Sequence, residues 1–355
     1  MGLTAGPVGV RVNADVKAGL LGLIDQATGG GWSVRRACGV LALNEDRAAR
    51  WRRRRQGGEP LDDSRPGCDE GLHALLGWER QAIVDVFDEW GQVDRSHRKL
   101  AHRGSRLGRV FVSESTVLRV LSAEDLTLPA RLPREPVGPR RPWPAWVEYR
   151  PCQVWGHDFT AFTRAVRDAL GILDLVSRKW ITTLVVPHSR GESEHVQAAY
   201  TRALEAEGLL GVVEARMVAP NSDQQLPVLL AVSDGGPQMT SGTTREFMAL
   251  HALAMHVGRP GTPTDQAHIE SLWGHVKGEW PHLEQIRDPT MLQAELERSR
   301  VEYNTVRLHA GIGYATPDDE HEGRGEPIRK LRREGLRAAR AARIAYRRRR
   351  PQDRT

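Results

Sequence analysis

Hydrophobic positions recur at helical spacing near the start of the chain. Leu20, Leu21, Leu23 and Ile24 predict a helix over residues 16–27, and three glycines at 29–31 end it. A short helix is expected over residues 33–38. A third is expected after Asn44, whose side chain is a good N-cap and is followed by two acidic residues. Residues 12–56 are therefore predicted to form an all-α unit of three helices.

A second helical region is predicted over residues 72–127. Residues 79–90 are amphipathic, residues 96–109 are basic, and Ser113 is placed to cap a helix that carries Val117, Leu118 and Leu121. Seven prolines interleaved with arginines follow. Proline fixes φ and removes a hydrogen-bond donor, so residues 128–151 are expected to form an extended Pro/Arg-rich linker.

From Cys152 onward, short apolar runs alternate with helical patterns. Strands are predicted over 153–160, 169–176, 180–187, 226–233 and 252–257. Helices are predicted over 192–208, 243–251, 265–280 and 289–303. This order predicts an α/β domain over residues 152–320, with a mixed five-stranded sheet and helices packed on it.

Charge is distributed unevenly. The whole chain carries +6, but residues 323–355 hold 13 Arg and Lys against 3 acids, a net +10, which leaves −4 for the rest. A second basic cluster spans residues 50–55. Clustered arginines indicate a polyanion partner, because phosphate contacts release counterions. A solubilising charged helix is the alternative for one cluster alone; two clusters favour nucleic acid.

The basic residues supply the candidate DNA contacts. The first three helices are interpreted as a helix-turn-helix, with an ordinary three-helix packing unit equally open, and residues 72–127 as a second helix-turn-helix-like unit. A basic C-terminal tail is predicted over residues 321–355, with a helix over 327–350 that carries one stripe of arginines. The candidate contacts are Arg47, Arg50, Arg52, Arg53, Arg54, Arg140, Arg141, Arg329, Arg333, Arg337 and Arg340.

Cysteine content and hydropathy exclude other classes. Cys38, Cys68 and Cys152 form no close pair, so neither a disulfide framework nor a zinc knuckle is indicated. His97 and His102 have ligand-like spacing but no accompanying Cys-x-x-Cys. No apolar run approaches the roughly 18 residues of a membrane span, and the first residues do not resemble a signal peptide. We expect a cytoplasmic, nucleoid-associated protein with no membrane partner.

Three carboxylates stand in settings that suit metal chemistry. Asp158 lies in an expected strand, Asp234 follows the apolar run at 228–232, and Glu270 lies in an expected helix. Hard divalent cations take oxygen ligands, and a pair of them serves phosphoryl transfer. His157 should point to the opposite face of its strand from Asp158, which excludes it as a ligand.

Other polar residues near these acids have simpler interpretations. Lys277 lies seven positions after Glu270 on the same helix face, suited to holding a phosphate, although an isolated lysine is more often a solvated surface residue. Asp265 suits a helix cap better than a metal ligand. His268 and His275 share a helix face but lack a third ligand, so they are interpreted as surface histidines.

The chain resembles integrase-core transposases of bacterial insertion sequences, most closely the insertion-sequence-three group. The resemblance spans roughly residues 155–317. It is carried by Trp155, Asp158, Thr160, Asp174, Ser177-Arg178, Ser233-Asp234-x-Gly236-x-Gln238, Arg259-Pro-Gly261, Asp265, Glu270-Ser271, Lys277, Glu279, Tyr303-Asn304, Arg307, His309 and Thr316-Pro317. Val232, Met239 and Gln266 depart from the family pattern at positions where His, Tyr and Asn are usual, and none of them is a metal ligand.

The resemblance implies a fold and an activity. It implies a ribonuclease-H-like core in which Asp158, Asp234 and Glu270 are catalytic and hold two Mg²⁺, with Mn²⁺ able to substitute. It implies double-stranded DNA partners, the element's inverted-repeat ends and target DNA, and a homo-oligomer on DNA that cuts and joins strands. Arg307 is as well suited to fixing the last helix as to contacting DNA. A catalytically decayed transposase acting as a repressor, and a cellular nuclease of the same fold, are the alternatives.

Overall fold

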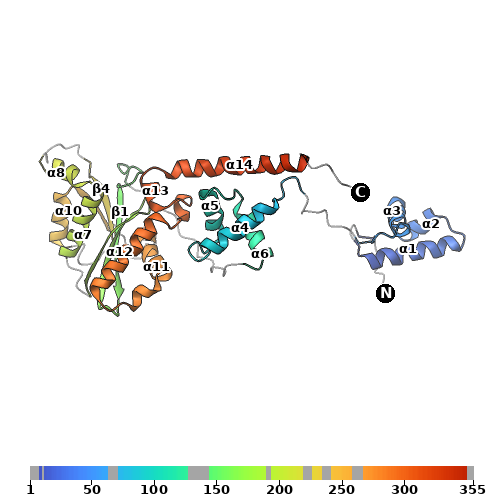
Figure 1. Cartoon of the computed structure of the whole chain (residues 1–355), viewed down its shortest axis with the longest axis horizontal. Helices are drawn as coiled ribbons and strands as arrows, with labels where there is room; N and C mark the ends of the chain where they lie inside the picture. The colour runs from blue at the N-terminus through green and yellow to red at the C-terminus, as the bar shows by residue number, and fades with distance from the viewer. Residues whose placement is uncertain are drawn as a thin grey trace. The chain divides into compact units, whose positions relative to one another are not determined.

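The computed structural model describes residues 8–9, 12–62, 71–126, 144–188, 193–218, 226–233, 241–257 and 267–349 (Figure 1). The chain divides into two units. The first comprises residues 1–74 with 347–355, and the second comprises residues 75–346. Among the described residues, no helix is long and apolar enough to cross a membrane.

Three helices form the first unit: α1 (Ala14–Gly29), α2 (Val34–Val40) and α3 (Glu45–Gln56). Each begins at a polar N-cap whose side chain accepts a backbone N–H of the first turn; the caps are Asn13, Ser33 and Asn44. The apolar stripe of α1 packs against α2 and α3 in a small core that includes Leu21, Ile24 and Trp51. The three predicted helices are confirmed, with ends one to two residues longer in most cases.

Three further helices open the second unit: α4 (Gly77–Trp90), α5 (His97–Arg106) and α6 (Glu114–Ala123). Ser113 caps α6, as predicted. The predicted helices here are confirmed, and the basic segment is itself mostly helical as α5. A buried ion pair stabilises this region, with Arg103 Nε 2.6 Å from Asp94 Oδ2.

The sheet of the second unit is mixed and five-stranded, as predicted. Its strands are β1 (Val154–Phe162), β2 (Arg167–Asp174), β3 (Trp180–Pro187), β4 (Leu229–Ser233) and β5 (Leu253–Val257). The order is β3-β2-β1-β4-β5. β1, β2 and β3 pair antiparallel, whereas β4 runs parallel to β1 and to β5. The central strand β1 is therefore the position where antiparallel pairing changes to parallel pairing.

Helices cover both faces of the sheet. On one face pack α7 (Ser193–Ala206), α8 (Leu210–Val218) and α10 (Gly242–Leu250); on the other pack α11 (Ala267–Glu279) and α12 (Pro289–Thr305). Shorter helical segments are η2 (Pro281–Gln285), between α11 and α12, and η3 (Ala310–Ile312) and α13 (Pro317–His321), after α12. Sequence periodicity did not predict α8, which is only 9 residues long.

The basic helix α14 (Gly325–Arg349) confirms the helix predicted over residues 327–350. It packs along the α4–α6 region (Figure 1). Arg343 pairs with buried Glu79, its Nη2 lying 2.8 Å from Oε1, and Arg332 donates to the carbonyls of Ala101 and Val112. Part of the positive charge of this helix is thus neutralised or hydrogen-bonded inside the protein.

Candidate active site

Alternation along β1 sends neighbouring side chains to opposite faces of the sheet. Trp155 and His157 face α7, where the Tyr200 hydroxyl lies 2.8 Å from His157 Nδ1. His157 is buried, and burial lowers its pKa to about 4. Asp158 consequently belongs to the other face, that of α11, and the exclusion of His157 as a ligand agrees with the structure.

The position of Asp158 is fixed independently by its neighbour on β2. Asp158 pairs with Gly171, and directly opposed residues in an antiparallel pair share a face. A Cβ on Gly171 would lie 2.7 Å from Cζ2 of Trp273, so only glycine permits the indole of α11 to approach this closely. The Trp273 Nε1–H then donates to the Asp158 carbonyl at 3.3 Å.

Glu270 lies in the first turn of α11, three residues before Trp273. Residues three apart on a helix share a face, so Glu270 stands one turn from the indole that contacts Asp158. Its side chain is exposed, and among the described residues no cation is paired with it. Asp158 is half-buried, and its Oδ1 accepts the Phe159 N–H at 2.8 Å. The structure thus brings the elements that carry two of the three predicted acids together.

The third predicted acid, Asp234, lies outside the described residues. β4 ends at Ser233, one residue before it, and is hydrogen-bonded directly to β1, where Gly156 pairs with Val232. Several other predicted residues also lie outside the described part of the chain: Arg140, Arg141, Gly236, Gln238, the 259–261 motif, Asp265 and the side chain of His268.

Lys277 lies on the same helix as Glu270 and makes contacts within the protein. Its Nζ donates to the Ala161 carbonyl at 2.9 Å, lies 3.1 Å from Glu284 Oε1 and sits over the Phe162 ring. The Glu284 side chain is 48% exposed, so this ion pair is solvent-screened. The predicted phosphate contact of Lys277 stays a prediction.

Arg307 fixes α11 to the end of α12. It is buried, and its Nε and Nη2 donate to the two carboxylate oxygens of Glu279 at 2.8 and 2.9 Å. Burial would raise the pKa of Glu279, but the Arg307 guanidinium outweighs it and holds that pKa below its ordinary value. Of the two roles open to Arg307 in the sequence, these contacts favour the structural one.

Two further residues of the family pattern, the buried Asn304 and the half-buried His309, also lie in contacts within the protein. Asn304 forms two hydrogen bonds with the backbone of Trp180, the first residue of β3. Its Oδ1 accepts the Trp180 N–H at 2.9 Å, and its Nδ2 donates to the Trp180 carbonyl at 2.8 Å. Trp180 in turn stands edge-on to Trp273, with ring centroids 5.7 Å apart. Burial, aided by Arg307 and Arg178, lowers the pKa of His309 to about 2. α12 is therefore anchored to the strand and the indole that support α11.

The candidate DNA-binding arginines of the first unit differ in their contacts. Three of them are held by the protein: Arg47 donates to Gly9 O, Arg52 to Asp25 and Arg54 to Asp62 O. Arg50 and Arg53 are exposed and, among the described residues, have no ion pair. They lie three apart on α3 and so share one face of that helix.

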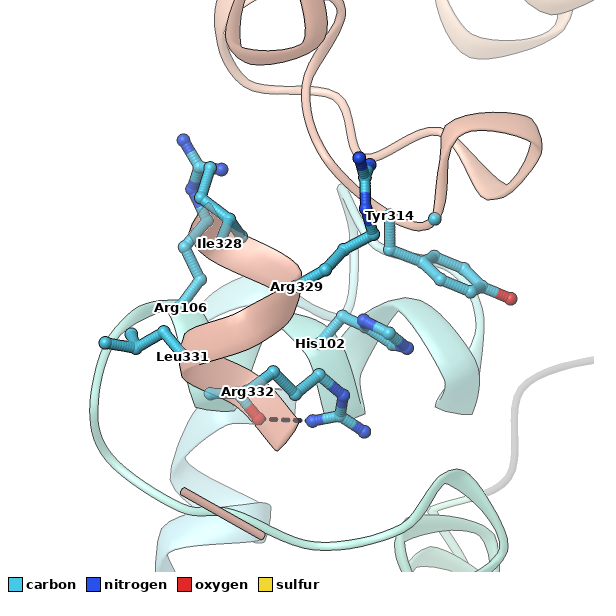
Figure 2. A pocket seen from close by; sticks show the side chains of 9 residues that line it. His102, Arg106, Tyr314, Ile328, Arg329, Leu331 and Arg332 are labelled. Carbon is cyan, nitrogen blue, oxygen red and sulfur yellow. Dashed lines mark hydrogen bonds between the residues drawn. The ribbon is translucent and has the colours of Figure 1, made fainter. Parts of the chain in front are cut away.

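The predicted stripe on α14 divides in the same way. Arg329 pairs with Glu320 and Glu326, and Arg333 with Glu326, whereas the side chain of Arg337 is exposed. Arg340 is also exposed, but it has a partner. Figure 2 shows a cavity of about 80 Å³ beside this helix, lined by His102 and Arg106 of α5 and by Arg329 and Arg332. His102 stacks on Tyr314 there, with ring centroids 4.1 Å apart. No pattern along the chain indicates this cavity.

Known proteins resemble the chain in sequence and in structure. A curated relative, the transposase for insertion sequence element IS904 from Lactococcus lactis subsp. lactis (strain IL1403), is 30% identical over 96 residues. That match spans 26% of this chain and 37% of the relative, so the chain matches well under half the length of that transposase.

Solved integrase structures resemble the chain distantly. The BIV integrase catalytic core is 17% identical at a TM-score of 0.35, covering 50% of this chain and 97% of that one. The HTLV-2 integrase catalytic core in complex with magnesium is 15% identical at a TM-score of 0.33, and the match covers 48% of this chain and 97% of that one. A chain of the simian T-cell lymphotropic virus intasome, solved in complex with the PP2A regulatory subunit B56 gamma, is 14% identical at a TM-score of 0.37. That match covers 68% of this chain and 73% of that one. At TM-scores this low, these likenesses add nothing to the assignment.

A family comparison covers the part of the site that includes α11. Residues 251–317 match the integrase core domain family, a span that contains Glu270, Lys277 and Arg307. The resemblance recognised in the motifs is confirmed: the chain is similar to an insertion-sequence transposase, and its residues 251–317 match an integrase core domain.

Proposed function

We propose that the chain is a metal-dependent DNA transposase of the insertion-sequence-three type, with a ribonuclease-H-like core. Its substrates are the inverted-repeat ends of its element and a target duplex. The observation that carries the proposal is the seating of α11 on β1. Trp273, packed on Gly171, holds the helix that bears Glu270 against the strand that bears Asp158.

The donor chemistry of the site fits hard divalent cations. Asp158 and Glu270 offer carboxylate oxygens, and Asp234, one residue beyond β4, is proposed as the third ligand. The exposed carboxylate of Glu270 has no competing ion pair among the described residues. When bound, two Mg²⁺ or Mn²⁺ ions activate the attacking oxygen and stabilise the leaving 3′ oxygen.

The protein's own residues supply position. The Trp273 indole sets the separation of α11 from β1, and the Arg307–Glu279 pair together with Asn304 holds α11 and α12 to the sheet. Lys277 would exchange its solvent-screened pair with Glu284 for a DNA phosphate. With that geometry fixed, water as nucleophile gives strand cleavage and a DNA 3′-hydroxyl gives strand transfer. In both reactions one phosphorus–oxygen bond forms as another breaks.

DNA affinity is assigned to the exposed arginines. Arg50 and Arg53 on α3, and Arg337 on α14, present guanidinium groups to solvent and suit phosphate contacts. Replacing one of them by alanine should weaken binding about equally for all DNA sequences. It should also reduce the slope of log affinity against log salt by about 1 for each phosphate that the variant no longer neutralises. A homo-oligomer assembled on paired ends completes the proposal.

Variant proteins test the catalytic assignment. Full-length Asp158→Asn, Asp234→Asn and Glu270→Gln should bind end-containing DNA as the wild type does, while Mg²⁺-dependent cleavage and joining disappear. Glu246→Gln is a matched control, since it removes an exposed acid of α10 that is assigned no metal. Persisting Mg²⁺-dependent joining by all three variants would remove the catalytic assignment.

A DNA-binding repressor derived from a transposase is the second candidate. The basic clusters suit DNA binding by a repressor equally well. A repressor, however, does not require a carboxylate such as Glu270 to be positioned close to β1. The two functions separate in the same assay. A repressor would show end-specific binding in the wild type with neither cleavage nor joining in Mg²⁺ or Mn²⁺.

A further inference from the structure

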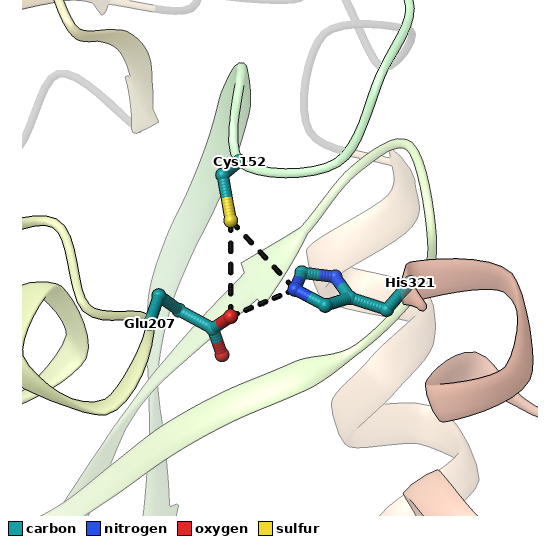
Figure 3. A group of neighbouring side chains, drawn as sticks. All are labelled: Cys152, Glu207 and His321. Atoms are coloured by element: carbon teal, nitrogen blue, oxygen red, sulfur yellow. Dashed lines mark hydrogen bonds and ion pairs between the residues drawn. The ribbon is translucent and has the colours of Figure 1, made fainter. Parts of the chain in front are cut away.

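Three side chains that the proposed transposition chemistry does not use converge at one end of the sheet (Figure 3). Cys152 lies two residues before β1, Glu207 follows the end of α7, and His321 is the last residue of α13. Cys152 Sγ is 3.7 Å from both Glu207 Oε2 and His321 Nε2, and those two atoms are 2.7 Å apart. The residues are 55 to 169 positions apart in the chain, so no sequence spacing could reveal them.

The distances are close to those around a tetrahedral zinc ion. Zn–S bonds of about 2.3 Å and Zn–N or Zn–O bonds of about 2.0–2.2 Å imply sulfur-to-nitrogen and sulfur-to-oxygen edges of roughly 3.6 Å. Both sulfur distances in the cluster match. The nitrogen-to-oxygen edge should be roughly 3.4 Å. His321 and Glu207, now at hydrogen-bonding distance, would therefore separate slightly.

Neighbouring groups orient the candidate ligands. The Ser177 hydroxyl lies 2.9 Å from His321 Nδ1 and 3.0 Å from Asp174 Oδ1, so a proton on Nδ1 has an acceptor and Nε2 points to the cluster. Lys179 Nζ lies 2.8 Å from Glu207 Oε1, which leaves Oε2 for the cluster. Carboxylate-supported histidine of this kind is typical of zinc sites, where the outer partners fix the tautomer and the ring orientation.

The backbone of Cys152 is held in an unfavourable conformation. Its φ is 63°, in the left-handed region that non-glycine residues rarely adopt. Its N–H donates to Asp174 Oδ2 at 2.6 Å, which keeps the turn in place. Strained residues cluster at sites where geometry is demanded. Asp174 thus supports two of the three candidate ligands, Cys152 through its backbone and His321 through Ser177.

We propose that Cys152, Glu207 and His321 bind a zinc ion, with water as the fourth ligand. A thiolate and an imidazole select zinc over magnesium. Binding releases the thiol proton as the sulfur–zinc bond forms. The ion would tie together three segments that are far apart in the sequence: the start of β1, the end of α7 and the end of α13. β1 separates the two sites: from Val154 to Asp158 the strand advances about 13 Å, so the cluster at Cys152 is distinct from the proposed magnesium site.

Metal content and cobalt spectroscopy test the proposal in the full-length protein. After removal of bound metal and titration with Zn²⁺, the wild type should retain one equivalent, and Co²⁺ in its place should give a thiolate-to-cobalt charge-transfer band. Cys152→Ser, which preserves size, should lose both. Cys38→Ala is the matched control, because Cys38 belongs to the first unit, and it should keep both.

Further variants separate the outcomes. Glu270→Gln should retain the zinc and the band even though joining is lost, so the two proposals fail independently. Ser177→Ala should bind zinc roughly 10–100-fold more weakly through loss of its support for His321. A wild type without the cobalt band at stoichiometric metal would overturn the proposal, even if Cys152→Ser failed to fold. That result would leave Lys179, Glu207 and His321 as a hydrogen-bonded network only.

Discussion

A methyl group added to Gly171 should disturb the packing that brings the candidate acids together. Gly171→Ala places a Cβ 2.7 Å from Cζ2 and 3.2 Å from Cη2 of Trp273, and 3.4 Å from Trp180 Nε1. Both tryptophans are buried and packed edge-on against each other, so neither can yield without moving its neighbour. The expected response is a shift of α11 away from β1.

The size of the effect follows from two opposing terms. Overpacking a core costs about 1–3 kcal/mol. Replacing glycine in a strand regains roughly 0.5–1 kcal/mol of chain entropy. A net loss of about 1–2 kcal/mol in the free energy of unfolding is expected. For a domain of this size it corresponds to a melting temperature lowered by roughly 2–8 °C. Thermal and urea unfolding followed by circular dichroism measure it.

A double-mutant cycle separates this local clash from general damage. Trp273→Phe removes the ring that the new methyl meets. The loss of unfolding free energy in the double variant should therefore be smaller than the sum of the losses in the two single variants. Gly274→Ala, on the exposed side of the same helix with no atom within 4 Å of the added Cβ, should be neutral or slightly stabilising. Additive losses in the cycle, or a Gly171→Ala protein as stable as the wild type, would refute the reasoning.

Three further predictions concern stability. Glu279→Gln leaves buried Arg307 without its counterion and should cost about 3 kcal/mol in urea unfolding. Lowering the pH from 6.5 to 4 should reduce the free energy of unfolding by up to about 3 kcal/mol. In the folded protein the pKa of His157 is lowered to about 4, so over this range His157 takes up a proton more readily in the unfolded chain than in the folded protein. Asn44→Ala should cost the first unit about 1 kcal/mol by thermal melting, through loss of the α3 cap.

Matched variants identify the cause in each case. Glu295→Gln removes an acid from α12 that is paired only with exposed partners, and should change stability little. His157→Gln should flatten the acid limb by about 1.4 kcal/mol per pH unit, and an unchanged slope would contradict the assignment to His157. Asn44→Asp retains a capping oxygen and should restore the stability that alanine removes.

Local patterns predict most of the secondary structure because they act over a few residues. The predicted bounds of β3 are the observed ones, since a run of apolar and β-branched residues ends at Pro187. Residue type alone identifies the caps Asn44 and Ser113. The mixed sheet follows from the order of elements. Periodicity misses α8 because a helix of 9 residues with few polar positions shows little of it.

Side-chain contacts between distant segments are beyond sequence patterns. Placing Asp158 and His157 on opposite faces needs only strand alternation. By contrast, no local signal shows that Gly171 makes room for Trp273, because Gly171 lies on β2 and Trp273 lies on α11, far along the chain. Nor can composition show which arginines stay in solvent. Arg50 and Arg53 do, while Arg52 of the same run pairs with Asp25.

The central claim is that acids from β1, from the end of β4 and from α11 hold the same metal ions. Anomalous scattering from Mn²⁺ in crystals of the protein grown or soaked with manganese tests it most directly. Anomalous peaks are expected within coordination distance of Asp158, Asp234 and Glu270, with Glu270 reaching an ion that Asp158 also binds. Peaks that leave Glu270 turned away from the ions, in crystals of a protein that joins DNA in Mn²⁺, would contradict it.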